Sequence, residues 1–253
     1  MSDQPRADAR AARVALERLL DADAPHLADL LPASFLDAAE AYVALLLDAN
    51  ARLNLTRVVE PEAVARLHLL DAVAALPLLD EARPASAIDL GSGGGVPGLV
   101  LAIARPEVGW TLIDSVRKKV DALRGFVETL GLSNVTVVAD RAEVLGRNTR
   151  HRDAHDIVTA RACAAMPVLV EYALPMLRRG GWLVAWKAQV GAQEMAAGAA
   201  ATALLGGGPA HWRPSGAPSL GDHGFVVVPK VASSTPERFP RRPGEPGRRP
   251  LGR

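Results

Sequence analysis

Apolar residues recur at helical intervals through the first third of the chain. One stripe is formed by Leu36, Ala39, Val43 and Leu46. A second, less regular stripe is formed by Val64, Leu67, Asp71 and Val73. Steps of three and four residues place side chains on one face of a helix. Pro32 and Pro61 separate the segments, because proline does not continue a helix. The pattern predicts an N-terminal helical extension over residues 1–80.

After Pro84 the period changes, and short apolar runs alternate with amphipathic stretches. The runs predict strands at residues 87–90, 110–113, 135–138, 157–159, 182–186 and 225–228. Residues 116–130 predict the best defined helix, which Gly131 would cap. Strand and helix alternation predicts an α/β fold with a doubly wound, mostly parallel sheet over residues 81–232. Two low-complexity stretches, 147–155 and 196–222, predict loops or weakly ordered insertions.

The composition limits what the protein can be. A chain of 253 residues that is 49% apolar can bury one large core. One cysteine, Cys163, allows no intrachain disulfide, and it is interpreted as a small buried residue. No stretch has the roughly 20 uninterrupted apolar residues that cross a bilayer, and the six histidines are scattered. We expect a soluble, cytoplasmic, monomeric protein without a metal site or a membrane partner.

Positive charge gathers at the C-terminus, although the formal net charge is only +1. Residues 233–253 hold six arginines interleaved with prolines, a pattern that predicts a basic tail without a helix. A local concentration of arginine suits contact with nucleic acid phosphates. Arg241 and Arg242 are therefore candidate RNA contacts.

The glycine-rich segment at residues 89–98 predicts a ligand site. An apolar strand runs into glycines and then into a helix, the place where an open parallel sheet meets a nucleotide-like ligand. Gly93, Gly95 and Gly98 satisfy the G-x-G-x-x-G pattern of dinucleotide-binding oxidoreductases. Asp89, two residues before Gly91, instead favours a ligand with a cationic ammonium and sulfonium, since a pyrophosphate would be repelled. Asp114, which follows the second strand, would accept hydrogen bonds from ribose hydroxyls.

Several separate motifs follow one another along the chain. They are Asn54-Leu55-Thr56, Arg66-x-His68-x-x-Asp71, the glycine turn, Leu112-Ile113-Asp114-Ser115 with Lys118, Arg141-Ala142-Glu143, Thr159-Ala160-Arg161-Ala162, Lys187, and Phe239-Pro240-Arg241-Arg242-Pro243-Gly244. In this order they resemble the motifs of the ribosomal RNA small-subunit methyltransferase G family, also called glucose-inhibited division protein B.

The resemblance implies a class I S-adenosylmethionine-dependent methyltransferase, with a Rossmann-like, seven-stranded, mostly parallel sheet and an N-terminal helical extension. It implies methylation of N7 of the guanine conventionally numbered 527, in the 530 loop of 16S ribosomal RNA. The partner would be that RNA or the assembling small ribosomal subunit. In the cofactor site, the resemblance implies that Gly91 and Val96 line the glycine turn, Asp114 holds the ribose, Ala142 and Glu143 lie beside the adenine, and Arg161 reaches the pocket.

Each candidate substrate residue also has a structural interpretation. Asn54 could close a turn, His68 could be a hydrogen-bonded structural histidine, and Lys187 could face solvent instead of RNA phosphate. No catalytic base is expected, because N7 of guanine has a lone pair and no proton to lose. An oxidoreductase that uses a nicotinamide cofactor and a non-catalytic RNA-binding protein are the alternative functions.

Overall fold

A computed structural model describes residues 3–252 and contains one seven-stranded sheet in the order β3-β2-β1-β4-β5-β7-β6. The strands are β1 (Ser86–Leu90), β2 (Gly109–Asp114), β3 (Val135–Ala139), β4 (His155–Arg161), β5 (Leu177–Lys187), β6 (His211–Pro214) and β7 (Gly224–Pro229). Strands β1 to β5 pair in parallel, whereas β7 is antiparallel to β5 and to β6. The predicted α/β class and the mostly parallel sheet are confirmed, as are all six predicted strands.

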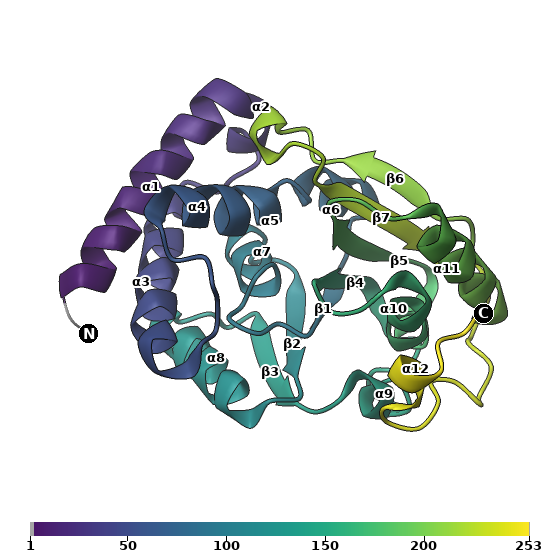
Figure 1. Cartoon of the computed structure of the whole chain (residues 1–253). Coiled ribbons are helices and arrows are strands. Elements are labelled where there is room, and N and C mark those ends of the chain that lie inside the picture. Colours follow the sequence, from purple (N-terminus) through teal and green to yellow (C-terminus); the bar gives the residue numbers. More distant parts are fainter. Residues whose placement is uncertain (1–2, 253) are drawn as a thin grey trace.

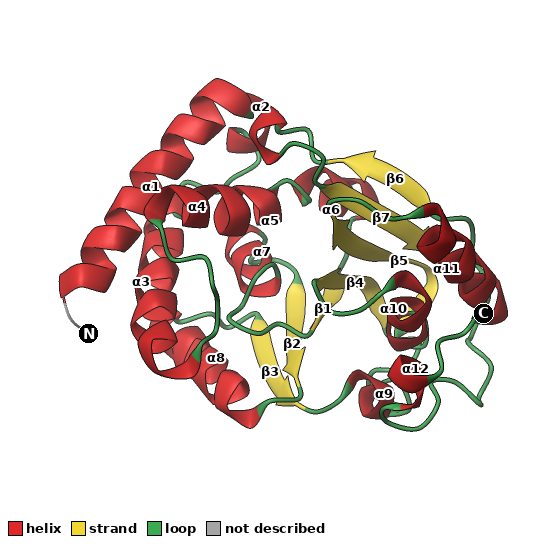
Figure 2. Cartoon of the chain, in the orientation of Figure 1, coloured by secondary structure: helices red, strands yellow, loops and turns green. Residues whose placement is uncertain are grey.

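Helices cover both faces of the sheet (Figures 1 and 2). On one face, α7 (Gly98–Ala104) and α8 (Arg117–Leu130) share a buried apolar cluster with the N-terminal helices. On the other face lie α9 (Ala142–Leu145), α10 (Met166–Ala173) and α11 (Ala192–Leu204). Gly131 ends α8 in a left-handed conformation with φ +65°, as the sequence predicts.

The N-terminal extension consists of α1 (Asp3–Asp23), α2 (Pro25–Ala28), α3 (Phe35–Leu53), α4 (Pro61–Val64), a π-helical turn η1 (Ala65–Leu70), α5 (Asp71–Val73) and α6 (Leu76–Ala82). Leu16, Tyr42 and Leu70 are fully buried in the same cluster as Trp110 of β2. Within residues 3–252, no helix combines the length and apolar character that crossing a membrane requires.

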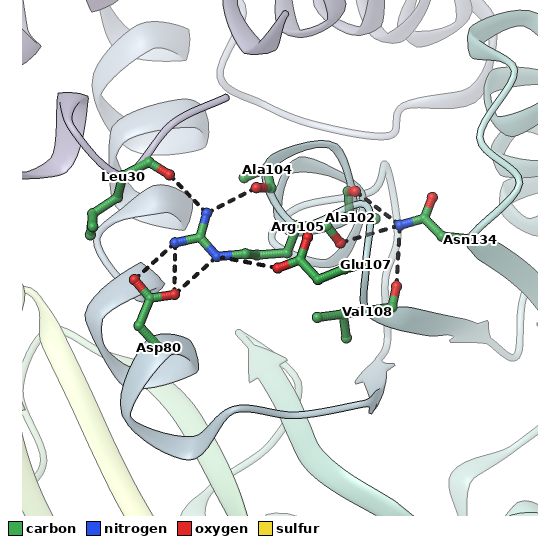
Figure 3. A network of polar contacts seen from close by, with 8 residues as sticks. All are labelled: Leu30, Asp80, Ala102, Ala104, Arg105, Glu107, Val108 and Asn134. Atoms are coloured by element: carbon green, nitrogen blue, oxygen red, sulfur yellow. Dashed lines mark hydrogen bonds and ion pairs between the residues drawn. The ribbon is translucent and has the colours of Figure 1, made fainter. Parts of the chain in front are cut away.

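An ion pair fastens the extension to the sheet at the amino ends of the strands (Figure 3). Arg105, just after α7, donates to both carboxylate oxygens of Asp80 in α6, at 2.8 and 3.0 Å through Nη2. The same guanidinium donates to the Leu30 carbonyl oxygen at 2.9 Å. Three segments distant in the sequence therefore meet at one largely buried arginine.

The prediction of a loop over residues 196–222 is wrong. Most of α11 lies there, followed by β6 and a 3₁₀ turn η2 (Pro218–Leu220). The alanine-rich composition that suggests low complexity also has the highest helix propensity, and α11 packs against α10. Residues 147–154, in contrast, form turns as expected, and β4 begins at His155.

The C-terminal tail contains a helical turn, α12 (Glu245–Arg248), where the sequence predicts none. Pro246 lies in its first turn, where a missing backbone N–H costs nothing. The tail also packs against the domain, since Phe239 is buried beside α9 and α10 residues. Residues 233–252 are thus part of the folded body.

Candidate functional site

A pocket of about 330 Å³ lies at the carboxyl ends of β1, β2 and β4 and beside α9, within the usual size range of small-ligand sites. Its walls are formed by Leu90, Gly91, Ile113, Asp114, Ser115, Val116, Lys119, Asp140, Arg141, Ala142, Glu143, Ala162, Cys163 and Tyr172. Of the predicted cofactor residues, Gly91, Asp114, Ala142 and Glu143 belong to this wall. This edge of a parallel sheet is where open α/β folds bind ligands.

The glycine turn presents only its first glycine to the pocket. Gly91 has φ +69°, a conformation that L side chains rarely adopt, and it lies at the wall. Gly93, Gly95 and Val96, which the sequence also predicts to be cofactor residues, are not among the wall residues in the described part of the chain. Gly98 begins α7 in close packing, since a Cβ there would lie 2.6 Å from the Asp89 Cβ.

Asp114 connects β2 to the glycine turn. Its Oδ2 accepts from the Gly93 backbone N–H at 3.0 Å, and its Oδ1 accepts from the Val116 N–H at 2.8 Å. A carboxylate oxygen has two lone pairs, so each retains acceptor capacity toward the pocket. The fixed, nearly buried carboxylate therefore fits a pair of ribose hydroxyls, which are hydrogen-bond donors.

Asp89 acts from behind the pocket and not at its wall, contrary to the sequence interpretation. It is fully buried, and Thr159 donates to its Oδ1 at 2.6 Å. Its Oδ2 has no hydrogen-bond partner among the described residues and faces Gly98. Burial raises the pKa of Asp89 to about 6, with the Thr159 hydrogen bond opposing the shift.

Glu143 and Tyr172 also belong to the pocket wall. Glu143 is buried, and its Oε1 accepts from the Gly244 N–H at 2.7 Å, so the tail helps to place it. Tyr172 comes from α10, and its periodic apolar context gave no sign of a pocket residue. Burial raises the pKa of the Tyr172 hydroxyl to about 12, followed by the effect of Glu143.

Cys163 also differs from its sequence interpretation, because it is exposed at the pocket wall and not a buried core residue. It lies close to Gly91, since a Cβ at that glycine would be 3.4 Å from the thiol sulfur. Desolvation, followed by the charges of Asp89 and Asp114, raises the pKa of the thiol to about 11. The thiol is therefore neutral at physiological pH and a poor nucleophile.

Arg161 is directed away from the pocket, contrary to the expectation from the resemblance. Its guanidinium pairs with the carboxylate of Asp71 at 2.8 Å and donates to His68 Nδ1 at 3.2 Å. His68 is 3% exposed and lies 2.8 Å from the Thr56 hydroxyl, which corresponds to the structural interpretation of this histidine. Through these contacts Arg161, at the end of β4, is linked to His68 and Asp71 of the extension.

The other candidate RNA residues are mostly occupied within the fold. Asn54 caps α3 in a left-handed conformation, with its N–H bonded to the Asn50 carbonyl. Lys187 donates to Glu194 at 2.9 Å and to the Ala164 carbonyl. Arg241 forms a bidentate pair with Glu171, which is fully buried, so its guanidinium faces inward. Arg242, in contrast, is exposed.

Side chains that could bind a metal ion are dispersed over the fold. Across residues 3–252, no three histidine, cysteine or acidic side chains converge closely enough to hold such an ion.

Comparison with known proteins agrees with this geometry. The O-methyltransferase TomG from Streptomyces achromogenes, solved with S-adenosylmethionine, aligns with 76% of the chain and 90% of its own length, with a TM-score of 0.52. At 16% identity this likeness establishes the class I methyltransferase fold alone.

Sequence relatives are much closer. Ribosomal RNA small subunit methyltransferase G of Deinococcus deserti is 42% identical over 87% of this chain and 90% of its own length. The protein of the same name from Moorella thermoacetica is 40% identical over 84% and 88%. The model of the family described as rRNA small subunit methyltransferase G matches residues 36–217. With most of its length matched by that model and by these relatives, the chain belongs to the rRNA small subunit methyltransferase G family.

Proposed function

We propose that the protein transfers a methyl group from S-adenosylmethionine to N7 of a guanine in 16S ribosomal RNA, the guanine in the 530 loop that the sequence motifs imply. The observation that carries the proposal is the open pocket at the ends of β1 and β2, with Gly91 and the Asp114 carboxylate in its wall. Family membership supplies the reaction class, a methyltransferase that uses S-adenosylmethionine.

Different residues of the pocket wall would hold different parts of S-adenosylmethionine. Asp114 would accept hydrogen bonds from the ribose hydroxyls, the Gly91 backbone would allow close approach at the strand end, and Ala142 and Glu143 would lie beside the adenine. Asp89 contributes negative charge from behind the turn. The bound cofactor supplies an electrophilic methyl group on a sulfonium.

The target atom explains why the site needs no base. N7 of guanine attacks with a ring lone pair and loses no proton, so catalysis depends on alignment and on exclusion of water. His68 could not serve in any case. Burial, followed by the charge of Arg161, lowers its pKa to about 4, and its Nδ1 lone pair accepts from Arg161.

The RNA must reach the pocket as an unstacked base, since a guanine inside a helix cannot approach the methyl group. Lys119 lies at the pocket wall, and Arg117 and Lys118 are exposed beside it at the start of α8. These cations and Arg242 are the proposed phosphate contacts. We take the protein to act as a cytoplasmic monomer on naked RNA or on the assembling subunit.

Methyl incorporation tests the proposal directly. Purified protein and S-adenosylmethionine labelled in the methyl group are incubated with unmethylated 16S RNA, and in a parallel arm with small-subunit particles. N7-methylguanine is then located by strand scission. RNA incubated without the protein is the negative control, and Asp114→Ala should need about tenfold more S-adenosylmethionine for the same transfer. Transfer to an exocyclic nitrogen, or calorimetric binding of NAD in place of S-adenosylmethionine, would contradict the proposal.

A further inference from the structure

One guanidinium joins the N-terminal extension to the last residue of β4. Arg161 Nη1 donates to Asp71 Oδ2 at 2.8 Å and also to the Leu67 carbonyl oxygen. Its Nη2 donates to His68 Nδ1 at 3.2 Å. Asp71 is 3% exposed, so this is a largely buried ion pair. Removing one partner of such a pair leaves the other charge uncompensated.

The π-helical turn η1 explains how one short segment supplies three acceptors. A π turn is wider than an α turn, and such turns are frequent at functional sites. Here the Asp71 N–H bonds to the Arg66 carbonyl, and the Leu67 carbonyl is directed to Arg161. His68 and Asp71, three residues apart, then contact the same guanidinium.

His68 has a fixed tautomer in this network. Arginine can only donate, so Nδ1 must accept and the proton must lie on Nε2. Nε2 then donates to Thr56 Oγ1 at 2.8 Å. That hydroxyl also accepts from the Val58 N–H at 3.0 Å. The network therefore also fixes the loop between α3 and α4.

The same arginine is adjacent in sequence to the pocket wall. Ala162 and Cys163 follow Arg161 directly, and both belong to that wall. Ala162 has φ +51°, in the left-handed region that is unfavourable for a residue with a Cβ. Such a conformation persists only where the surrounding contacts hold it. Arg161, the preceding residue, is held by Asp71, His68 and the Leu67 carbonyl.

We infer that His68 and Asp71 are positioning residues for the cofactor, because they hold Arg161 and thereby the Ala162–Cys163 wall of the pocket. This inference rests on the proposed function only in taking S-adenosylmethionine as the occupant of that pocket. Neither side chain belongs to the pocket wall. Asp71 also contacts His223 at 3.3 Å and His68 contacts Thr56, but of these partners only Arg161 is adjacent in sequence to the wall.

Cys163 makes the wall measurable, since it is the only cysteine in the chain. The test compares the rate at which a maleimide labels Cys163 in the wild type and in Asp71→Asn, with no cofactor present. The main effects on the pKa of this thiol come from desolvation, Asp89, Asp114 and Glu143 and not from Asp71, so a clearly changed labelling rate reports a changed wall. The dissociation constant for S-adenosylmethionine is measured on the same samples.

Asp80→Asn is the matched control. It breaks the Asp80–Arg105 pair, which ties the same extension to the sheet at the opposite end of the strands (Figure 3). For Asp71→Asn we expect faster labelling and a dissociation constant about fivefold higher, as if the wall were in its binding arrangement one-fifth of the time. In that variant kcat at saturating cofactor should change less than the dissociation constant. Asp80→Asn should change neither labelling nor binding.

A second variant covers the case in which Asp71→Asn does not fold. His68→Leu removes the acceptor for Arg161 without leaving an unpaired charge, and it should shift both readouts in the same direction. His68→Gln keeps an acceptor and a donor and should restore wild-type behaviour. Unchanged labelling and binding in folded His68→Leu and Asp71→Asn, or an equal change in Asp80→Asn, would overturn the inference. If the wild type fails to bind S-adenosylmethionine while Asp71→Asn is still labelled faster, the proposed function is wrong. The result would still support the inference that Asp71 positions the Ala162–Cys163 wall.

Discussion

Asp114 has two tasks, since its carboxylate holds two backbone amides and also lines the pocket. We predict that Asp114→Ala weakens binding of S-adenosylmethionine about tenfold or more, because a hydrogen bond to a charged group contributes about 1.5 to 3 kcal/mol. Isothermal titration calorimetry measures the loss, and circular dichroism checks that the variant is folded. Asp114→Asn keeps one acceptor oxygen and should lose less. Unchanged affinity in folded Asp114→Ala would remove this residue from the site.

His68 gives a prediction about the pH dependence of the reaction. With a pKa of about 4 it remains neutral throughout the physiological range. The single-turnover rate on saturating RNA should therefore be nearly flat between about pH 6.5 and 8.5, where an ordinary histidine base would titrate. His68→Gln should cost far less than the roughly 10² to 10⁴ that loss of a general base costs. A tenfold rise of the wild-type rate near pH 6.5, absent in the variant, would identify His68 as a base after all.

Asp89 gives a prediction about stability against pH. Its pKa in the folded protein, about 6, lies above the ordinary value of 3.8, so between these values the folded state binds more protons than the unfolded state. Its contribution to stability is therefore present below about pH 4 and is lost as pH rises to about 6. Asp89→Asn should remove this loss. The free energy of unfolding of the variant relative to wild type, from urea titrations, should rise by about 1 to 3 kcal/mol from pH 4 to 7. A constant difference across that range would show that Asp89 does not titrate as proposed.

At the scale of elements, the tail contains two adjacent arginines with different tasks. Arg241 is the counter-ion of the fully buried Glu171 in α10, whereas Arg242 is exposed. We predict that Arg241→Ala destabilises the protein by about 3 kcal/mol, because breaking a buried pair leaves a buried charge. Arg242→Ala should leave stability unchanged and lower the slope of log RNA affinity against log salt by about 0.7 to 0.9. Thermal unfolding and salt titrations of both variants check the division. Equal melting temperatures of the two variants, or equal slopes of RNA affinity against salt, would contradict this division.

Six strands were predictable because each contains a short apolar run bounded by turn residues, and the runs of β1, β2, β4, β5 and β7 are mostly buried. The last part of the sheet was not. The sequence around α11 is nearly uniform in alanine, so its low hydrophobic contrast hid a helix that packing against α10 stabilises. Strand β6 is fully exposed along its length, and only its pairing with β7 defines it. The π turn η1 was not predicted either, and its Leu67 carbonyl and His68 contact Arg161, which is distant in the sequence.

The pocket wall was predictable where a residue is placed by its own backbone or by its position at a strand end, as Gly91 and Asp114 are. It was not predictable where long-range pairing decides which way a side chain points. Arg161 lies at a strand end yet turns toward Asp71, 90 positions away. Arg241 is in a basic tail yet pairs with Glu171, 70 positions away. A sequence motif locates a residue at a strand end or in a tail, but the direction of its side chain depends on an ion-pair partner that is distant in the sequence.

On the scale of the whole molecule, the helical extension and the methyltransferase sheet share one core. The buried cluster runs without interruption from Leu16 in α1 through Tyr42 in α3 to Trp110 in β2 and Trp186 in β5. The indole N–H of Trp186 donates to the Asp71 carbonyl at 2.8 Å. Removing residues 1–80 would therefore expose a large apolar face of the sheet. The extension is a distinct segment of the sequence, but its side chains belong to the same buried core as those of the sheet.

This continuity predicts a single cooperative unfolding transition for the full chain. Hydrogen exchange shows whether the extension unfolds together with the sheet or by itself, because local opening gives each segment its own exchange free energy. In a slow-exchange segment, binding of S-adenosylmethionine should raise that free energy by RT ln(1 + [L]/Kd), about 2.7 kcal/mol at a hundredfold excess over Kd. If the extension opens only together with the core, ligand binding should raise the exchange free energy of the buried α3 amides as much as that of the β1 and β4 amides. This holds although α3 contributes no residue to the pocket wall. The exposed strand β6 is the internal control and should gain little. Protection gained in β1 and β4 with none in α3 would mean that the extension unfolds by itself, and residues 81–253 should then fold alone.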